Sequence, residues 1–68
     1  MRDPNRIPEM IDLLRQVWER YPDWRLGQLV CNLGRNVGMF DPFFVEDDKM
    51  KASIEWEIED HDRRNVNE

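Results

Sequence analysis

A helical repeat of apolar residues, bounded by two prolines, is the feature that most constrains this chain. Between Asn5 and Pro22 the apolar side chains recur every three or four residues, at Ile7, Met10, Ile11, Leu13, Leu14, Val17, Trp18 and Tyr21. This spacing places them on one face of an α-helix. Pro8 fits in the first turn, where a missing N–H costs little, and Pro22 pushes the residue before it out of the helical region. The sequence therefore predicts an amphipathic helix that begins near residues 5–7 and ends before Pro22.

A second helix is predicted directly after the first. Asp23 stands where an N-cap residue is expected, and Gly38 is suited to the position that follows a helix C-terminus. The apolar residues between them have helical spacing: Leu26, Leu29, Val30, Leu33 and Val37. Because the predicted link is only Pro22 and Asp23, we expect the two helices to form a hairpin or a corner with both apolar faces turned inward.

The third segment, from residue 48 to about residue 60, is ambiguous by pattern. Met50, Ile54, Ile58 and His61 share a helix face, yet residues 54–58 also alternate as in a strand. A helix is the better prediction, because a single strand would have no partner in an otherwise helical chain. The acidic run at residues 46–48 also favours a helix N-terminus through capping and the macrodipole.

The predicted fold is an all-α, single-domain three-helix bundle with an aromatic linker before the third helix. The domain is expected to span residues 1–62, with a frayed polar tail at 63–68. The core is expected to centre on Leu14, Trp18, Leu29, Leu33 and Ile54. A chain of 68 residues has little apolar surface to bury. We therefore expect Phe40, Phe43 and Phe44 to close the open end of the helical hairpin.

Charge divides the chain into two unlike halves. Residues 1–38 hold six arginines and five acids, a net charge of +1, whereas residues 39–68 hold ten acids and four bases, a net charge of −6. The total of −5 disfavours direct binding to nucleic acid or to an anionic membrane and favours a protein partner with a basic surface. No apolar run is long enough to span a bilayer and no signal peptide is recognised. The single cysteine suits a reducing compartment, so a cytoplasmic location is expected.

Residues with catalytic or metal-binding chemistry are few. Cys31 and His61 have no group that would orient them as a catalytic pair, and Ser53 has no histidine nearby in sequence. Glu57 and His61 are one helical turn apart, but structural zinc takes Cys and His in sets of four, and no loop supplies oxygen ligands for calcium. We therefore predict neither an enzyme nor a protein that binds a cofactor or metal.

Two surfaces remain as candidates for binding. Trp56 is predicted to point away from the apolar face of the third helix, and exposed tryptophans are common anchors of protein interfaces. One side of the same helix carries a row of acids: Asp48, Glu55, Glu59 and Asp62. The second candidate is a stripe on the second helix, formed by Gly27, Cys31 and Gly34. Interior glycines cost helix stability, so a close approach by another helix, of this chain or of a second copy, is expected there.

Part of the chain resembles a known family. The similar elements are Met10-Ile11-Asp12-Leu13-Leu14, Trp18, Pro22-Asp23, Leu26, Gln28-Leu29, Leu33 and Asp47-Asp48. Over residues 9–56 they resemble the YihD-like family of small bacterial proteins, most specifically in the phrase Trp-x3-Pro-Asp-x2-Leu-x-Gln-Leu. The resemblance implies a small, helical, cytoplasmic protein, and it supplies no functional residue to carry over. This chain departs from the family in its shorter length, its glycine stripe and its tail.

Three functional interpretations remain open from the sequence. The first is a non-enzymatic adaptor or regulator that binds a protein through the third helix and Trp56. The second is a phage-type inhibitor, of the anti-restriction or anti-CRISPR kind, whose acidic row mimics nucleic acid against a nucleic-acid-binding complex. The third is a structural homodimer that uses the glycine stripe.

Overall fold

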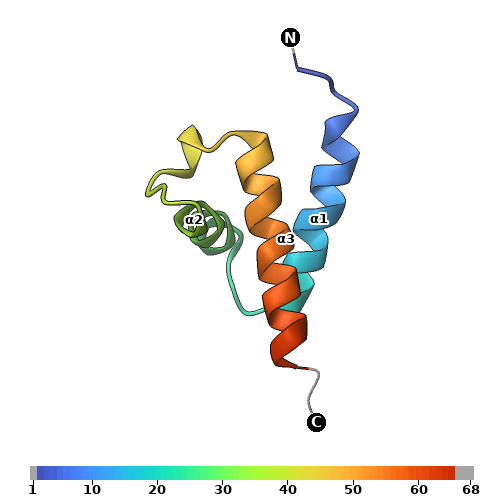
Figure 1. The fold of residues 1–68 in the computed structure, drawn as a ribbon, viewed down its shortest axis with the longest axis vertical. Helices are drawn as coiled ribbons and strands as arrows, with labels where there is room; N and C mark the ends of the chain where they lie inside the picture. The colour runs from blue at the N-terminus through green and yellow to red at the C-terminus, as the bar shows by residue number, and fades with distance from the viewer. Residues whose placement is uncertain (1, 66–68) are drawn as a thin grey trace.

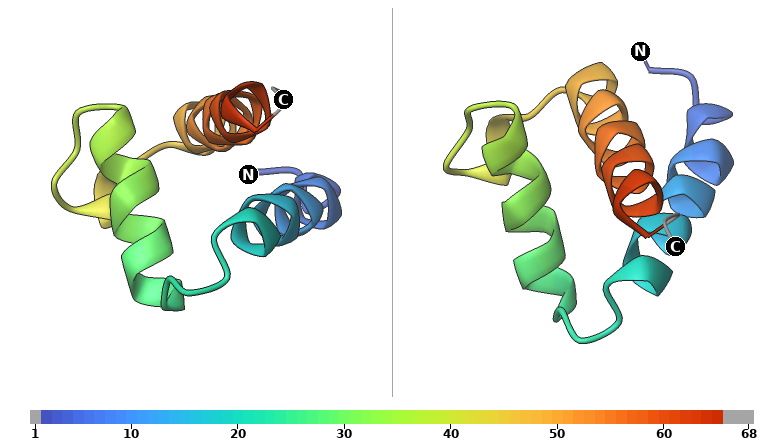
Figure 2. Two further views of the ribbon diagram at one scale, coloured as in Figure 1. Left: turned by 90° about the horizontal axis from the view of Figure 1, so that it is seen from below. Right: turned by 60° about the horizontal axis from the view of Figure 1, so that its bottom comes forward.

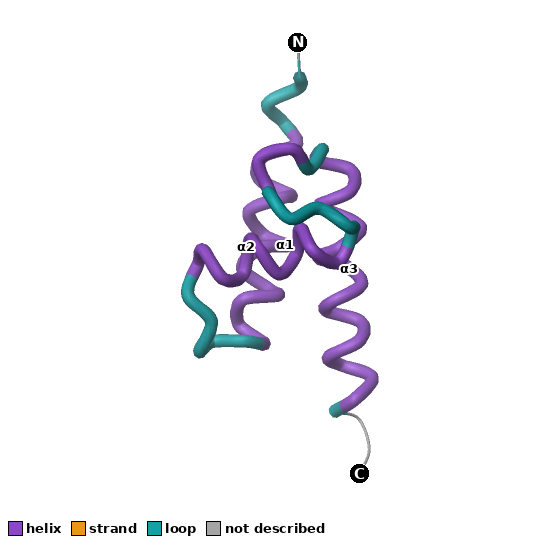
Figure 3. Tube along the Cα trace, turned by 90° about the vertical axis from the view of Figure 1, so that its left-hand side faces the viewer, coloured by secondary structure: helices purple, strands orange, loops and turns teal. Residues whose placement is uncertain are grey.

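The computed structural model describes residues 2–65, which form three α-helices and one short 3-10 helix. These are α1 (Arg6–Arg20), α2 (Leu26–Asn36), η1 (Pro42–Phe44) and α3 (Asp47–Arg64). α1 and α3 lie side by side and run in the same direction, whereas α2 crosses them (Figure 1). Helices and loops account for all of the described residues, without a strand (Figure 3). The predicted all-α, three-helix fold is therefore confirmed, as is the choice of helix over strand for residues 53–60.

The first helix begins and ends where the prolines predict. Pro8 lies in its first turn, and the helix ends at Arg20, with Tyr21 as the C-cap residue directly before Pro22. Val17 is fully buried on its inner face, while Leu14 and Trp18 are partly buried against the same core. Local sequence signals are therefore sufficient to define α1.

The link between α1 and α2 is longer than predicted, and Asp23 is not its N-cap. Residues 21–25 form a turn in which the rings of Tyr21 and Trp24 stack with centroids 4.3 Å apart. The indole Nε1 of Trp18 donates a hydrogen bond of 2.8 Å to the Trp24 carbonyl. Arg25 is the N-cap residue instead, and its N–H donates to Oε1 of Gln28 at 2.8 Å. Aromatic packing holds the link in this turn, and α2 begins two residues later than predicted.

The predicted hairpin of the first two helices is wrong, because α3 lies between them. α3 packs along α1 on one side and against α2 on the other, and α2 runs crosswise away from α1 (Figure 2). The fully buried apolar side chains come from all three helices: Val17, Leu29, Leu33 and Ile54. The stacked turn at residues 21–25 directs α2 away from α1, so the alternative of a corner describes this link better.

α3 is longer than the predicted segment. It begins at Asp47 and ends at Arg64, so it runs through the first residues of the predicted tail. Near its end, Asp60 forms ion pairs with Arg63 at 3.6 Å and with Arg64 at 2.9 Å. Basic residues in a last turn also suit the helix dipole. Residues 66–68 of the predicted tail lie outside the described residues.

The aromatic linker does not close the end of the bundle as predicted. Its rings point to solvent, with Phe40, Phe43 and Phe44 exposed by 87%, 83% and 61%. The space beside α2 is taken by backbone instead, because Met39 and Pro42 pack directly against Gly34. Gly38 makes this return possible with a φ of +81°, in the position after the helix end that the sequence predicts.

Candidate functional site

The predicted partner-binding residues lie on the exposed surface of α3. Trp56 is 51% exposed, as its helical position predicts. The four acidic residues of the predicted row are also exposed: Asp48, Glu55, Glu59 and Asp62. Because α-helical residues three, four and seven apart share a face, these carboxylates lie along one side of α3, next to Trp56.

Asp62 differs from the other three acids, because it belongs to the contact between α1 and α3. Both of its carboxylate oxygens accept hydrogen bonds of 2.8 Å from Arg20. The guanidinium group of Arg20 lowers the pKa of Asp62 to about 2. Within residues 2–65, no cation lies at ion-pair distance from Asp48, Glu55 or Glu59. The charge available to a partner therefore comes from these three residues, which we call the acidic row from here on.

Two neighbouring hollows extend the surface from Trp56 to the aromatic linker. The hollow beside Trp56 has a volume of about 320 Å³ and is lined by Asn36, Val37, Ala52, Ser53 and Trp56. The next hollow, of about 260 Å³, is lined by Val37, Met39, Phe44, Val45, Glu46 and Lys49. Val37 lines both hollows, so Trp56 and Phe44 stand at the two ends of one apolar surface.

The sequence analysis missed the part of this surface formed by Val37 and Phe44. Phe44 was expected in the interior, because a small chain has few large apolar side chains with which to fill its core. The available signal was Pro42 among Phe40, Phe43 and Phe44, since a short linker with a fixed proline φ has little freedom to fold all its rings inward.

Two hydrogen bonds made by the buried side chains of Ser53 and Glu57 hold α3 against the last turn of α2. Ser53 Oγ donates to the Leu33 carbonyl at 2.7 Å, and Asn36 Nδ2 donates to Glu57 Oε1 at 2.9 Å. Leu33 is among the last four residues of α2, whose carbonyls lack a partner within the helix. Ser53 and Glu57 stand on either side of Trp56 in the sequence, so these bonds fix the rotation of α3 that exposes the indole.

The residues weighed for catalysis or metal binding have structural contacts instead. Ser53 is buried and uses its hydroxyl hydrogen on the Leu33 carbonyl. The ring of His61 packs edge-on against Tyr21 with centroids 5.1 Å apart, while Glu57 bonds to Asn36. The described residues contain no group of three or more His, Cys, Asp or Glu side chains arranged to hold a metal ion.

The glycine stripe of α2 does not form a single exposed surface. Gly27 is exposed, Cys31 is half-buried and Gly34 is buried. A Cβ atom added to Gly34 would lie 3.2 Å from the Met39 carbonyl oxygen and 3.6 Å from Pro42. The close approach expected at Gly34 therefore comes from the linker of the same chain and not from another helix.

Comparison of the chain with protein-family models, with curated proteins and with solved structures found no match. The resemblance to the YihD-like family therefore stays a prediction. In the part of the chain that the structure describes, no helix has the length and apolar character needed to cross a membrane.

Proposed function

We propose that this protein is a non-enzymatic interaction module, an adaptor or regulator, that binds a partner protein through the exposed surface of α3. The observation that carries the proposal is the position of Trp56, half exposed beside Glu55 and Glu59. A tryptophan buries a large area on binding and keeps a polar N–H, which makes it a frequent interface anchor. The apolar surface between Trp56 and Phe44 adds area on which a partner can pack.

The partner is expected to carry lysine or arginine side chains around an apolar pocket. Among residues 2–65, no cation lies at ion-pair distance from the acidic row, so a basic rim would complement it without breaking an ion pair. The same charge disfavours direct contact with nucleic acid or with an anionic membrane. We also propose a cytoplasmic location, because Cys31 is a free cysteine suited to a reducing compartment.

Inhibition of a nucleic-acid-binding complex is a second proposal for the same surface. The three carboxylates of the acidic row share one side of α3, as mimicry of a phosphate backbone requires. The fourth carboxylate on this side, Asp62, is bound by Arg20, so fewer charges are available for such mimicry, which favours the adaptor. A homodimer built on the glycine stripe is not retained, since Gly34 is buried within the chain.

The test is affinity capture from native lysate, followed by binding measurements with each captured protein after identification and purification. We expect Trp56→Ala to weaken binding by roughly 30-fold, the effect of losing an interface anchor worth about 2 kcal/mol. Glu55→Lys should weaken binding more at low salt than at high salt, since salt screens exposed charges. Competition by nucleic acid for the same partner would support the inhibitor.

The matched control for the charge reversal is Asp23→Lys. Asp23 is also exposed and the change in charge is identical, but the residue lies in the link before α2. Equal effects of Asp23→Lys and Glu55→Lys would show that net charge, not the surface of α3, governs binding. Wild-type affinity in Trp56→Ala would contradict the proposal.

A further inference from the structure

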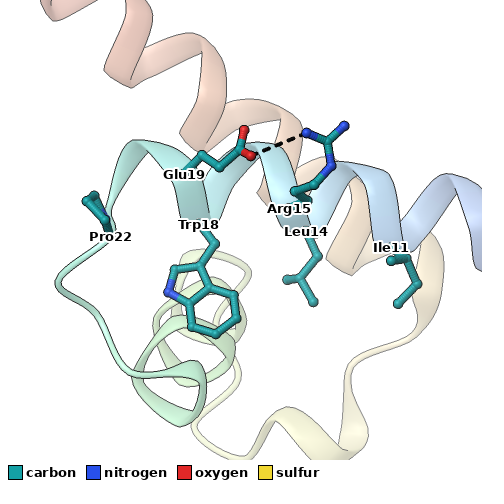
Figure 4. Close-up of a pocket in the computed structure, with 6 residues that line it drawn as sticks. All are labelled: Ile11, Leu14, Arg15, Trp18, Glu19 and Pro22. Carbon is teal, nitrogen blue, oxygen red and sulfur yellow. Dashed lines mark hydrogen bonds and ion pairs between the residues drawn. The ribbon is translucent and has the colours of Figure 1, made fainter.

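The side of α1 that carries Ile11, Leu14 and Trp18 is a second apolar surface, which the proposed function does not use. Ile11 is 58% exposed, Ile7 is also exposed, and Leu14 and Trp18 are half-buried. Ile11, Leu14 and Trp18 project from one side of the helix over a hollow of about 580 Å³, with Arg15 and Glu19 paired at its edge (Figure 4). This hollow shares no lining residue with those beside Trp56.

The spacing of these four residues is that of a helix-pairing seam. Ile7, Ile11, Leu14 and Trp18 follow one another at steps of four, three and four residues. This is the spacing of the a and d positions at which two helices interlock in a coiled coil. The row of α1 that packs deepest into the core contains the fully buried Val17, with Met10 and Leu13 beside it. Leu14 and Trp18 also touch this core but stay half-buried, and Ile7 and Ile11 are exposed. α1 therefore has one apolar row covered within the chain and a second row that is covered only in part.

Charge indicates which partner suits this second row. Arg15 stands beside the row and is hydrogen-bonded to Asp12 and Glu19, so the border carries both signs of charge. Residues 1–38 have a net charge of +1 (six Arg against five acids), whereas residues 39–68 have −6. Two copies that met through α3 would bring their acidic rows together, and this repulsion is absent at α1.

We propose that two copies of this chain form a twofold-symmetric homodimer by packing these α1 rows together. In such an interface each copy contributes the same four residues, Ile7, Ile11, Leu14 and Trp18. The monomer fully buries only Val17, Leu29, Leu33 and Ile54 among its apolar residues in the described part of the chain. Pairing would withdraw a further apolar row from water, which is a common way for small domains to supplement a limited core. The acidic row and Trp56 have no part in this contact, so the dimer does not depend on the proposed function.

Sedimentation equilibrium of the purified full chain across the micromolar range tests the proposal. We expect wild type to approach twice its monomer mass of 8.3 kDa as concentration rises. Ile11→Asp should raise the dimer dissociation constant by at least tenfold, since it places a carboxylate in the apolar seam. Ile7→Asp should do the same without weakening α1, because an acidic residue near a helix N-terminus suits the helix dipole. Circular dichroism establishes that each variant retains its helices.

Trp56→Ala is the control and should leave the dimer unchanged. A wild-type chain that stays monomeric throughout this range would overturn the dimer, as would a dimer of undiminished affinity in folded Ile11→Asp and Ile7→Asp. Dimer loss in Trp56→Ala alone would assign self-association to α3 instead. None of these outcomes bears on capture of a partner by α3, which is measured separately.

Discussion

The two sides of α3 are held by different kinds of contact. Toward α1 its edge is lined by ion pairs between exposed or half-buried side chains: Arg6–Asp47, Glu9–Lys51 and Arg20–Asp62. Toward α2 the contact is formed by the fully buried Leu29 and Leu33 and by the hydrogen bonds of Ser53 and Glu57. Exposed ion pairs contribute little each, whereas buried side chains lose much when truncated. The ion pairs flank an apolar contact formed by the buried Val17, whereas the α2 side adds buried hydrogen bonds to its apolar contact. The buried contacts should therefore cost more to remove than any one of the exposed ion pairs.

The largest effect is expected from Leu33→Ala. Leu33 is fully buried where α2 meets α3, so its truncation should lower the free energy of unfolding by about 2–5 kcal/mol. Leu26→Ala is the matched control on the same helix, because Leu26 is 49% exposed and should cost less than about 1 kcal/mol. Urea denaturation followed by circular dichroism measures both. Equal losses would mean that the α2 side does not carry the stability assigned to it.

A smaller effect is expected from Ser53→Ala. This change leaves the Leu33 carbonyl without its buried donor, so the free energy of unfolding should fall by about 1–3 kcal/mol. Gln16→Ala removes a side-chain hydrogen bond to Asp12 on the exposed side of α1 and should cost less. Thermal unfolding of the two variants compares them directly. A larger loss in Gln16→Ala would contradict the greater weight expected of the buried hydrogen bond.

The smallest effect is expected from the pair of Arg20 and Asp62, and it depends on pH. Arg20 holds the pKa of Asp62 at about 2 in the folded protein, below the ordinary value of 3.8. As pH falls, the unfolded chain takes up the proton first. The pair therefore stabilises the fold above about pH 4, and this contribution is lost as pH falls toward 2.

Thermal unfolding of wild type and Asp62→Asn across this pH range measures the contribution. The difference in melting temperature between the two proteins should shrink as pH falls from 4 to 2. Added salt at neutral pH should also reduce it, because the side chain of Asp62 is exposed. A difference that stays constant with pH would show that the pair makes no contribution of its own.

The candidate site was predictable where it depends on one helix alone. The exposure of Trp56 and its place beside Glu55 and Glu59 follow from helical spacing within α3. The pairing of Asp62 with Arg20 was not predictable, because those residues are 42 positions apart and meet only when α1 lies along α3. The same is true of Phe44 and Val37, which border one hollow through the return of the linker after Gly38.

The sequence by itself determined the three helices, both ends of the first and the end of the second. The signals for them are the apolar period, the prolines and Gly38, and each acts over only a few residues. Tertiary structure alone decided that α3 separates α1 from α2, that Phe40 and Phe43 face solvent, and that Gly34 is covered by its own linker. These outcomes depend on the stacking of Tyr21 on Trp24 and on contacts between distant segments. The spacing of residues along the chain does not predict these contacts, because they stabilise the fold only after the helices have packed against one another.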